Sequence, residues 1–170
     1  KNYKEIISAI EQRLKDQNIT VSPKVIAVSK TFTLDKILPL IDCGHLDYGE
    51  NKVQEAIDKW SEIKLTKKEL KLHLIGKLQT NKVKQAVKIF DYIHSVDSEK
   101  LAKKIAEEET KQGKKIKIFI QVNIGNEDQK SGINTNQLSD FYQFCKTTEL
   151  NIVGLMCIPP FEEDPKRYFE

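Results

Sequence analysis

Short apolar runs alternate with amphipathic stretches along the whole chain. Ile6, Ile10 and Leu14 recur at helical spacing, and a continuous apolar run, Val25–Val28, follows beyond Pro23. Apolar residues three or four positions apart predict a helix. An uninterrupted β-branched run predicts a strand covered on both faces, as in a parallel sheet. The same order of helix and strand then repeats to the end of the chain.

The repeated pattern predicts six strands with a helix between each pair. The helix after the first strand can be capped by Thr33 and end at Gly44, and Pro39 inside it predicts a kink or a late start. Ser98 can cap a later helix that ends at Gly113. The predicted strands are residues 25–28, 46–48, 72–75, 92–96, 116–122 and 152–156, and the helices between them carry the apolar residues of 37–41, 53–60, 83–87, 101–106 and 138–145.

Strands that alternate with helices indicate an α/β protein with a parallel sheet, which is either an open doubly wound sheet or a (β/α)8 barrel. Six strands would complete the open sheet and leave the barrel two short, so the pattern alone slightly favours the open sheet. The loop after the first strand argues the other way. It reads SKTFT and lacks the glycines of a dinucleotide site.

Composition narrows the class of protein. The 170 residues suggest one domain, and 28 Lys+Arg against 25 Asp+Glu leave a net charge of +3. Only Arg13 and Arg167 are arginine and the lysines are scattered, so nucleic acid is a poor candidate partner. Cys43, Cys145 and Cys157 stand singly, which excludes disulfide scaffolds and zinc sites and fits the reducing cytoplasm. No apolar run is long enough for a membrane span, and the first residues read as an amphipathic helix rather than a signal peptide.

Lys30 is the best single candidate for chemistry. It follows the first predicted strand directly, at the sheet edge where parallel α/β folds place their active sites. An amine set against an apolar strand loses charge stabilisation, so its pKa falls and its neutral form can attack an aldehyde. The alternative is chance, because the chain contains 26 lysines.

Polar residues after the second strand have two interpretations. Glu50 and Asn51 occupy the same sheet edge as Lys30, and the Asn51 amide could bind a polar ligand group. Alternatively, both residues cap the following helix, where they would satisfy free N–H groups and favour the helix dipole.

The histidines and carboxylates predict structural roles. His73 alternates with Leu72 and Leu74, which suggests an interior histidine with satisfied hydrogen bonds. His94 and Ser95 point to opposite faces of one strand, so with Asp97 they cannot form a hydrolase triad. No histidine pair has metal-ligand spacing, so no metal site is expected. The carboxylates lie mostly in helices, such as residues 107–109, and suggest a solvated face.

Six stretches of the chain resemble one known family, the pyridoxal phosphate homeostasis proteins, which are single-domain relatives of the alanine racemase barrel. The matching stretches run in order across nearly the whole chain: VIAVSKT (25–31), DYGENKVQEA (47–56), HLIGKLQTNKVK (73–84), IHSVDS (93–98), QVNIGNEDQKSG (121–132) and IVGLMCIPP (152–160).

The resemblance implies a (β/α)8 barrel that binds pyridoxal 5'-phosphate (PLP) as a Schiff base on Lys30. It also implies that Asn51 lies near the cofactor ring, that Lys130 belongs to a loop over the barrel mouth, and that Met156 contributes to the cofactor site. No catalytic residue is implied. Residues 1–170 are then a single PLP-binding barrel domain whose C-terminal part is missing, because family members continue beyond a helix near Pro165 with two more strands and a phosphate-binding turn. A barrel without those strands exposes sheet edges and is not expected to be stable alone.

Three functions follow as hypotheses. The first is a cytoplasmic, monomeric carrier in PLP homeostasis that performs no turnover and hands PLP to apo-enzymes that depend on it. The second is a PLP-dependent amino-acid racemase, which needs two opposed bases, and nothing in this chain encodes the added domain that supplies the second. The third is a phosphosugar or nucleotide enzyme that shares only the barrel.

Overall fold

The computed structural model describes residues 3–125, 127, 130–161 and 166–168. Helix α1 (Tyr3–Asp16) comes first, and strands and helices then alternate as the apolar pattern predicts. The strands are β1 (Ala27–Val28), β2 (Asp47–Glu50), β3 (Lys71–Leu74), β4 (Tyr92–Val96), β5 (Lys117–Asn123), β6 (Ile133–Asn134) and β7 (Asn151–Met156). The remaining helices are α2 (Leu34–Asp42), α3 (Val53–Thr66), α4 (Val83–Ile89), α5 (Glu99–Gln112) and α6 (Leu138–Thr147), with short 3-10 turns η1 (Thr80–Lys82), η2 (Thr135–Gln137) and η3 (Lys166–Tyr168).

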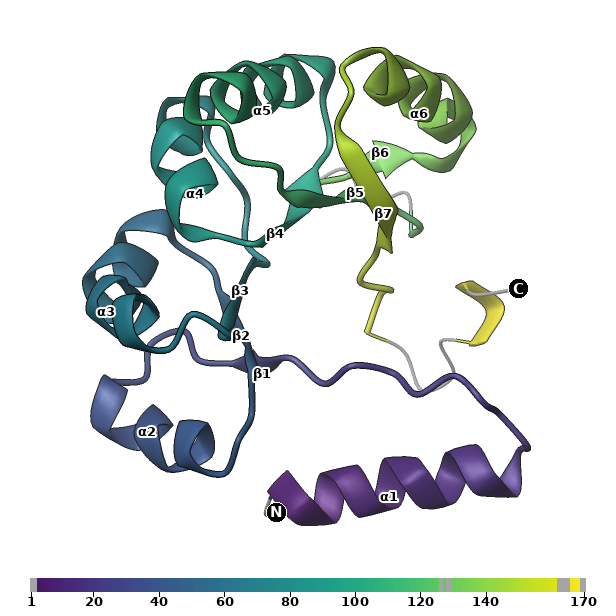
Figure 1. The fold of residues 1–170 in the computed structure, drawn as a ribbon. Coiled ribbons are helices and arrows are strands. Elements are labelled where there is room, and N and C mark those ends of the chain that lie inside the picture. Colours follow the sequence, from purple (N-terminus) through teal and green to yellow (C-terminus); the bar gives the residue numbers. More distant parts are fainter. Residues whose placement is uncertain (1–2, 126, 128–129, 162–165, 169–170) are drawn as a thin grey trace.

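The strands follow one another in the sheet in chain order. β1 to β5 pair in sequence and β7 pairs with β5, all of them parallel. The short β6 also pairs with β5, at its carboxyl end. Helices α2 to α6 lie on the outer side of this arc of strands (Figure 1). Sequential order with helices on one side is the arrangement of a (β/α)8 barrel, whereas a doubly wound sheet reverses its strand order at a switch point. The open-sheet interpretation is therefore wrong, and the described strands form an incomplete barrel.

The hydrophobic core fills the space between the outer face of the strands and the helices. Trp60 of α3, Val83 of α4 and Ile105 of α5 are fully buried against strand residues such as Leu72 and Ile118. Alternate residues of β3 and β4 point to this core, because side chains alternate between the two faces of a strand. His73 and His94 consequently lie on the inner face of the barrel.

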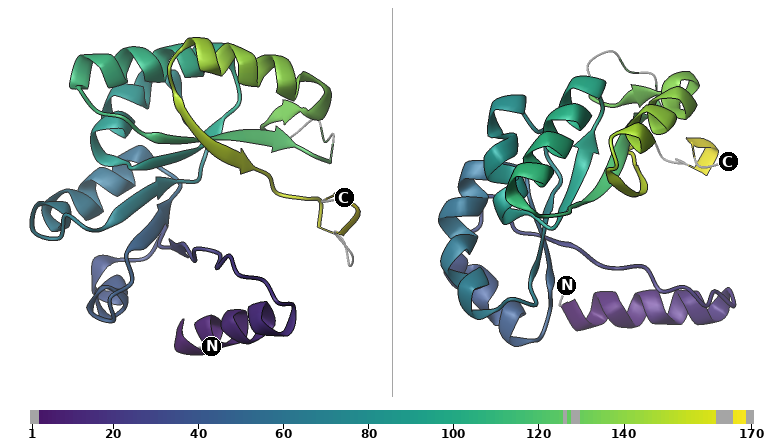
Figure 2. Two further views of the ribbon diagram at one scale, coloured as in Figure 1. Left: turned by 45° about the vertical axis from the view of Figure 1, so that its right-hand side comes forward. Right: turned by 45° about the horizontal axis from the view of Figure 1, so that its top comes forward.

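Helix α1 differs from the other helices because none of its residues is buried. It stands apart from α2 to α6 and is joined to β1 by an extended segment (Figure 2). A hydrogen bond of 3.0 Å between the Tyr3 hydroxyl and His45 Nδ1 connects α1 to the segment between α2 and β2.

Three expectations about individual elements are corrected. The first strand is shorter than predicted and is not covered on both faces: Val28 is 46% exposed. Helix α2 begins at Leu34 with Pro39 inside it, so the late start is wrong. Glu108 and Glu109 are buried instead of solvated, and Glu109 Oε1 accepts a hydrogen bond from the Ile116 backbone N–H at 2.6 Å.

The structure describes only part of the segment in which a further helix is expected. Pro165, near which a further helix is expected, lies outside the described residues. Residues 166–168 form the 3-10 turn η3.

Candidate functional site

The carboxyl ends of the parallel strands meet at one edge of the barrel. Lys30 lies two residues beyond β1, Asn51 follows β2 directly and Met156 is the last residue of β7. In barrels of this kind the loops at this edge form the ligand site. The fold therefore brings Lys30, Asn51 and Met156 to the edge where a ligand would bind, and Lys130 lies on the loop that leaves β5 at the same edge.

Lys30 occupies the second position of a tight turn, residues 29–32, which we name the Lys30 turn. The Phe32 N–H donates to the Ser29 carbonyl at 3.2 Å, and Thr31 has a φ of 64°. A positive φ at the third residue is the pattern of a type II turn, in which glycine or asparagine is usual. Threonine is β-branched, so this left-handed conformation is strained by roughly 1–3 kcal/mol and needs support from its surroundings.

A buried carboxylate supports the first residue of the Lys30 turn. Glu50 Oε1 accepts hydrogen bonds from Ser29 Oγ at 2.7 Å, from Lys59 Nζ at 2.9 Å and from Trp60 Nε1 at 2.9 Å. Lys59 Nζ also donates to the Ser29 carbonyl at 2.7 Å. Glu50 thus faces α3 and is engaged with its side chains. The capping interpretation is wrong for Glu50.

A second carboxylate of α3 supports the strained residue. Glu55 Oε1 accepts from the Thr31 backbone N–H at 2.6 Å and pairs with Lys59 Nζ at 3.1 Å. The hydrogen bond from Thr31 lowers the pKa of the Glu55 carboxyl, and Lys59 lowers it further, while partial burial opposes both. Glu55 is therefore held in its charged form beside the Lys30 turn.

Asn51 lies in a tightly packed part of the edge. Gly76, just beyond β3, approaches it so closely that a Cβ at Gly76 would lie 2.4 Å from the Asn51 carbonyl oxygen. Asn51 lines a pocket of about 380 Å³. Three lysines share that pocket, Lys52, Lys77 and Lys82. The N-cap of α3 is Lys52, without a side-chain capping bond, so Asn51 does not occupy the capping position either.

Lys130 makes no contact with the Lys30 turn or with Asn51 among the hydrogen bonds and ion pairs of the described residues. Its ammonium forms an ion pair with Glu127 and donates to the Pro159 carbonyl at 3.4 Å. It thereby links the loop after β5 to the segment after β7. The ion-pair partner of Lys130 is a carboxylate of the same loop. This pair was not identified from the sequence.

A hydrogen-bonded histidine pair crosses the inner face of the barrel. His73 Nε2 lies 3.0 Å from Asp47 Oδ1, and His73 Nδ1 lies 2.9 Å from His94 Nε2. Burial lowers the pKa of both histidines, that of His94 to about 4. The expectation that His73 is an interior histidine with satisfied hydrogen bonds is confirmed. The triad is absent as expected: His94 bonds to His73, and Ser95 Oγ is buried without a partner in the described part of the chain.

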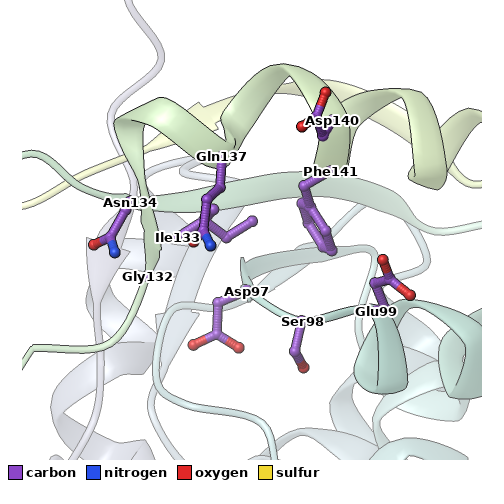
Figure 3. A pocket seen from close by; sticks show the side chains of 9 residues that line it. All are labelled: Asp97, Ser98, Glu99, Gly132, Ile133, Asn134, Gln137, Asp140 and Phe141. Atoms are coloured by element: carbon purple, nitrogen blue, oxygen red, sulfur yellow. The ribbon is translucent and has the colours of Figure 1, made fainter.

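A separate pocket of about 400 Å³ opens between the start of α5 and the start of α6 (Figure 3). Asp97, Glu99 and Asp140 give it an acidic lining. None of the predicted site residues lines it, although Asp97 and Ser98 follow β4 directly and so lie at the same carboxyl edge of the sheet as Lys30.

The supports of the Lys30 turn were missed by sequence reasoning. Glu55 and Lys59 stand four residues apart on a predicted helix, which is an available sign of an ion pair. That this pair reaches back to Ser29 and Thr31 depends on the docking of α3 against β1 and β2, which no local pattern contains.

Across the residues that the structure describes, no cluster of side chains could hold a metal ion. Within the same residues, no helix combines the length and apolar character that a membrane span requires.

The sequential parallel sheet, with helices on one side and a lysine at its carboxyl edge after the first strand, defines a barrel domain. Residues 7–170 match the family described as alanine racemase, N-terminal domain. The pyridoxal phosphate homeostasis protein of Buchnera aphidicola is 35% identical over 95% of this chain and 71% of its own length. The chain belongs to this family of barrel domains, and within it to the pyridoxal phosphate homeostasis proteins.

Two further relatives support this placement. The pyridoxal phosphate homeostasis protein of Aquifex aeolicus is 35% identical over 84% of this chain and 62% of its own length, so the chain spans about three fifths of that relative. PipY of Synechococcus elongatus, solved with PLP bound, is 35% identical, with a TM-score of 0.72 over 90% of this chain and 72% of PipY. The (β/α)8 expectation is thereby confirmed as the fold.

Proposed function

We propose that this protein binds PLP through Lys30 and serves intracellular PLP homeostasis as a carrier without turnover. The observation that carries the proposal is the position of Lys30. It is an exposed amine at the carboxyl end of the first barrel strand, in a chain that is similar to a protein solved with PLP bound. Residues 1–170 act, in this proposal, as a single PLP-binding barrel domain.

The residues at this edge fit the aldehyde end of PLP. Lys30 has neither a hydrogen bond nor an ion pair with its side chain among the described residues, so its amine is available. When bound, PLP supplies an aldehyde carbon that a neutral primary amine attacks, with loss of one water molecule and formation of a C=N bond. Asn51 would hydrogen-bond polar groups of the ring, and Met156 would contact its apolar part. Lys130 would hold the loop after β5 over the site through Glu127.

The racemase alternative needs a second base opposite Lys30. Among the described residues, His73 and His94 are candidate bases on the inner face, but they are hydrogen-bonded to each other, and His73 is also bonded to Asp47. This engagement favours the carrier over the racemase. Turnover of an amino acid that disappears in Lys30→Ala would favour the racemase instead.

The partners and location are part of the proposal. Apo-enzymes that use PLP would receive it from this carrier, which acts as a cytoplasmic monomer. The three cysteines are free thiols, which is compatible with a reducing compartment.

The test is covalent trapping on the full-length protein. We expect PLP followed by borohydride to add one pyridoxyl group to the peptide that contains Lys30, and Lys30→Ala to abolish this adduct. Lys68→Ala, which removes an exposed lysine ahead of β3 at the opposite edge, is the matched control and should leave the adduct unchanged. An adduct distributed over many lysines and unaltered by Lys30→Ala would refute the proposal.

A further inference from the structure

The Lys30 turn has a conformation that its own sequence does not favour. Thr31 adopts a φ of 64°, although a β-branched residue is among the least suited to this region. A turn of this kind persists only when contacts from elsewhere determine it. Those contacts should come from groups that reach the backbone on both sides of Lys30.

Three side chains make these contacts. Lys59 donates to the Ser29 carbonyl at 2.7 Å, and Glu55 accepts from the Thr31 N–H at 2.6 Å. Glu50 accepts from the Ser29 hydroxyl at 2.7 Å. We name Glu50, Glu55 and Lys59 the clamp.

The clamp is itself held rigidly. Lys59 bridges the two carboxylates at 2.9 and 3.1 Å, and its side chain is only 9% exposed. The Glu50 side chain is fully buried, and its Oε2 has no hydrogen-bond partner among the described residues. Burying charges in this way is weak evidence for a stabilising role, because desolvation offsets much of the attraction. The arrangement is better explained by the geometry that it imposes on the Lys30 turn.

We propose that the clamp positions Lys30 for reaction with PLP, by fixing the backbone on both sides of it from the helix side of the sheet. This inference rests on the proposed function of Lys30. Glu50, Glu55 and Lys59 are positioning residues, since they act on Lys30 through its neighbours Ser29 and Thr31. Loss of the clamp should release Thr31 from the left-handed conformation and leave the Lys30 amine without a fixed direction.

The experiment compares variants of the full-length protein in two measurements. Glu55→Ala removes the acceptor for Thr31, Lys59→Met removes the bridge, and Glu55→Gln restores an acceptor of the same length. Lys64→Met is the matched control, because Lys64 pairs with Asp91 from the far end of the same helix. The measurements are hydrogen exchange of the Thr31 and Phe32 amides, and the rate of PLP adduct formation on Lys30.

We expect Glu55→Ala and Lys59→Met to speed exchange of these two amides and to slow adduct formation by roughly ten- to a hundredfold, as expected for a misplaced reacting group. Glu55→Gln should recover most of the rate, and Lys64→Met should match the wild type in both measurements. Glycine adopts this turn without strain, so adding Thr31→Gly to Glu55→Ala should restore part of the rate of adduct formation. Such a recovery would exclude misfolding as the cause of the slower rate.

The possible results separate the two proposals. Wild-type protein that forms no adduct on Lys30 refutes the proposed function, and the positioning role with it. A normal wild-type adduct with unchanged rates in Glu55→Ala and Lys59→Met refutes the clamp alone. If Lys64→Met slows adduct formation as much as Glu55→Ala and Lys59→Met do, the clamp is also refuted. The slower rate would then come from a general loss of stability.

Discussion

At the scale of single residues, the buried histidine pair has a defined protonation pattern. Asp47 accepts from His73 Nε2–H, so His73 Nδ1 is the acceptor and His94 Nε2–H the donor. His94 also stacks on Phe119, with ring centroids 4.3 Å apart. Protonation of His73 Nδ1 would remove the acceptor of the bond between the two rings. Both histidines are therefore neutral in the folded protein at neutral pH.

This arrangement predicts that acid destabilises the fold through His94. Its pKa is about 4 in the folded protein against 6.5 in the unfolded chain, so the unfolded chain binds the proton more strongly. The stability is fully present above pH 6.5 and is lost as the pH falls toward 4. At about 1.4 kcal/mol per pKa unit, this loss of unfolding free energy is on the order of 3 kcal/mol. Denaturant unfolding measured at a series of pH values checks it.

His94→Phe provides the comparison for this prediction. The substitution keeps a ring against Phe119, removes the titrating group and leaves His73 Nδ1 without its donor. We expect lower stability at neutral pH by roughly 1–3 kcal/mol and a flatter pH dependence between 6.5 and 4. An equally steep pH dependence in this variant would contradict the assignment to His94.

At the scale of elements, the close approach of two strand ends defines the edge that carries Asn51. Gly76→Ala would place a Cβ 2.4 Å from the Asn51 carbonyl oxygen, which is backbone and cannot rotate away. We expect this variant to lose roughly 1–3 kcal/mol of stability and to attach PLP more slowly, because Asn51 must shift. Thermal unfolding and the rate of adduct formation measure the two effects.

Gly113→Ala is the matched control. Gly113 ends α5 with a φ of 61°, and a Cβ there meets nothing within 4 Å. Its replacement should cost about 1 kcal/mol through backbone strain alone and leave adduct formation unchanged. Equal adduct rates in the two variants would show that the shift of Asn51 does not matter.

Helices and strands were predictable from sequence where the hydrophobic periodicity and the capping residues indicate the same bounds. β4 has the predicted bounds, Tyr92–Val96, and α5 is capped by Ser98 and ends at Gly113, both as predicted. The two-residue strand β6 was missed, because so short a segment has no periodicity to detect. The burial of Glu109 was missed for a different reason: its partner, the Ile116 N–H, comes from the segment that follows its helix.

At the scale of the whole molecule, the sheet has two edges among the described residues. β1, which pairs only with β2, forms one edge, and β7 together with the two-residue β6, each paired only with β5, forms the other. Leu155 on β7 is 54% exposed. Apolar side chains on unpaired strands favour association with other chains.

Residues 1–170 produced as an isolated polypeptide should therefore self-associate as their concentration rises, whereas the monomer proposed above is the full-length protein. Leu155→Lys should reduce this association by placing a charge on the edge strand. Leu65→Lys is the control, because Leu65 is 75% exposed but lies on α3, away from both edges. Light scattering over a concentration series measures the effect. A chain that stays monomeric, or two variants that behave alike, would exclude association through the edges.

The positions of the candidate site residues in the fold were predictable from the order of elements, and the contacts that support the Lys30 turn were not. Lys30 and Asn51 could be placed at one edge because parallel strands all end on the same side. Glu50 could not be assigned, because the same residue at the same position suits either a helix cap or a buried acceptor. Only the docking of α3 onto β2 decides between these roles.

The β-sheet separates the clamp, on its helix side, from the side chains of the inner face of the barrel. Changes on the inner face alter which molecules are admitted, and changes around Lys59 alter how the amine is presented. The clamp residues share no side-chain contact with the inner-face histidines His73 and His94 among the described residues. The effects of changes in the clamp and on the inner face on the free energy of binding should therefore add. Ligand preference and amine reactivity could then be adjusted by design one at a time.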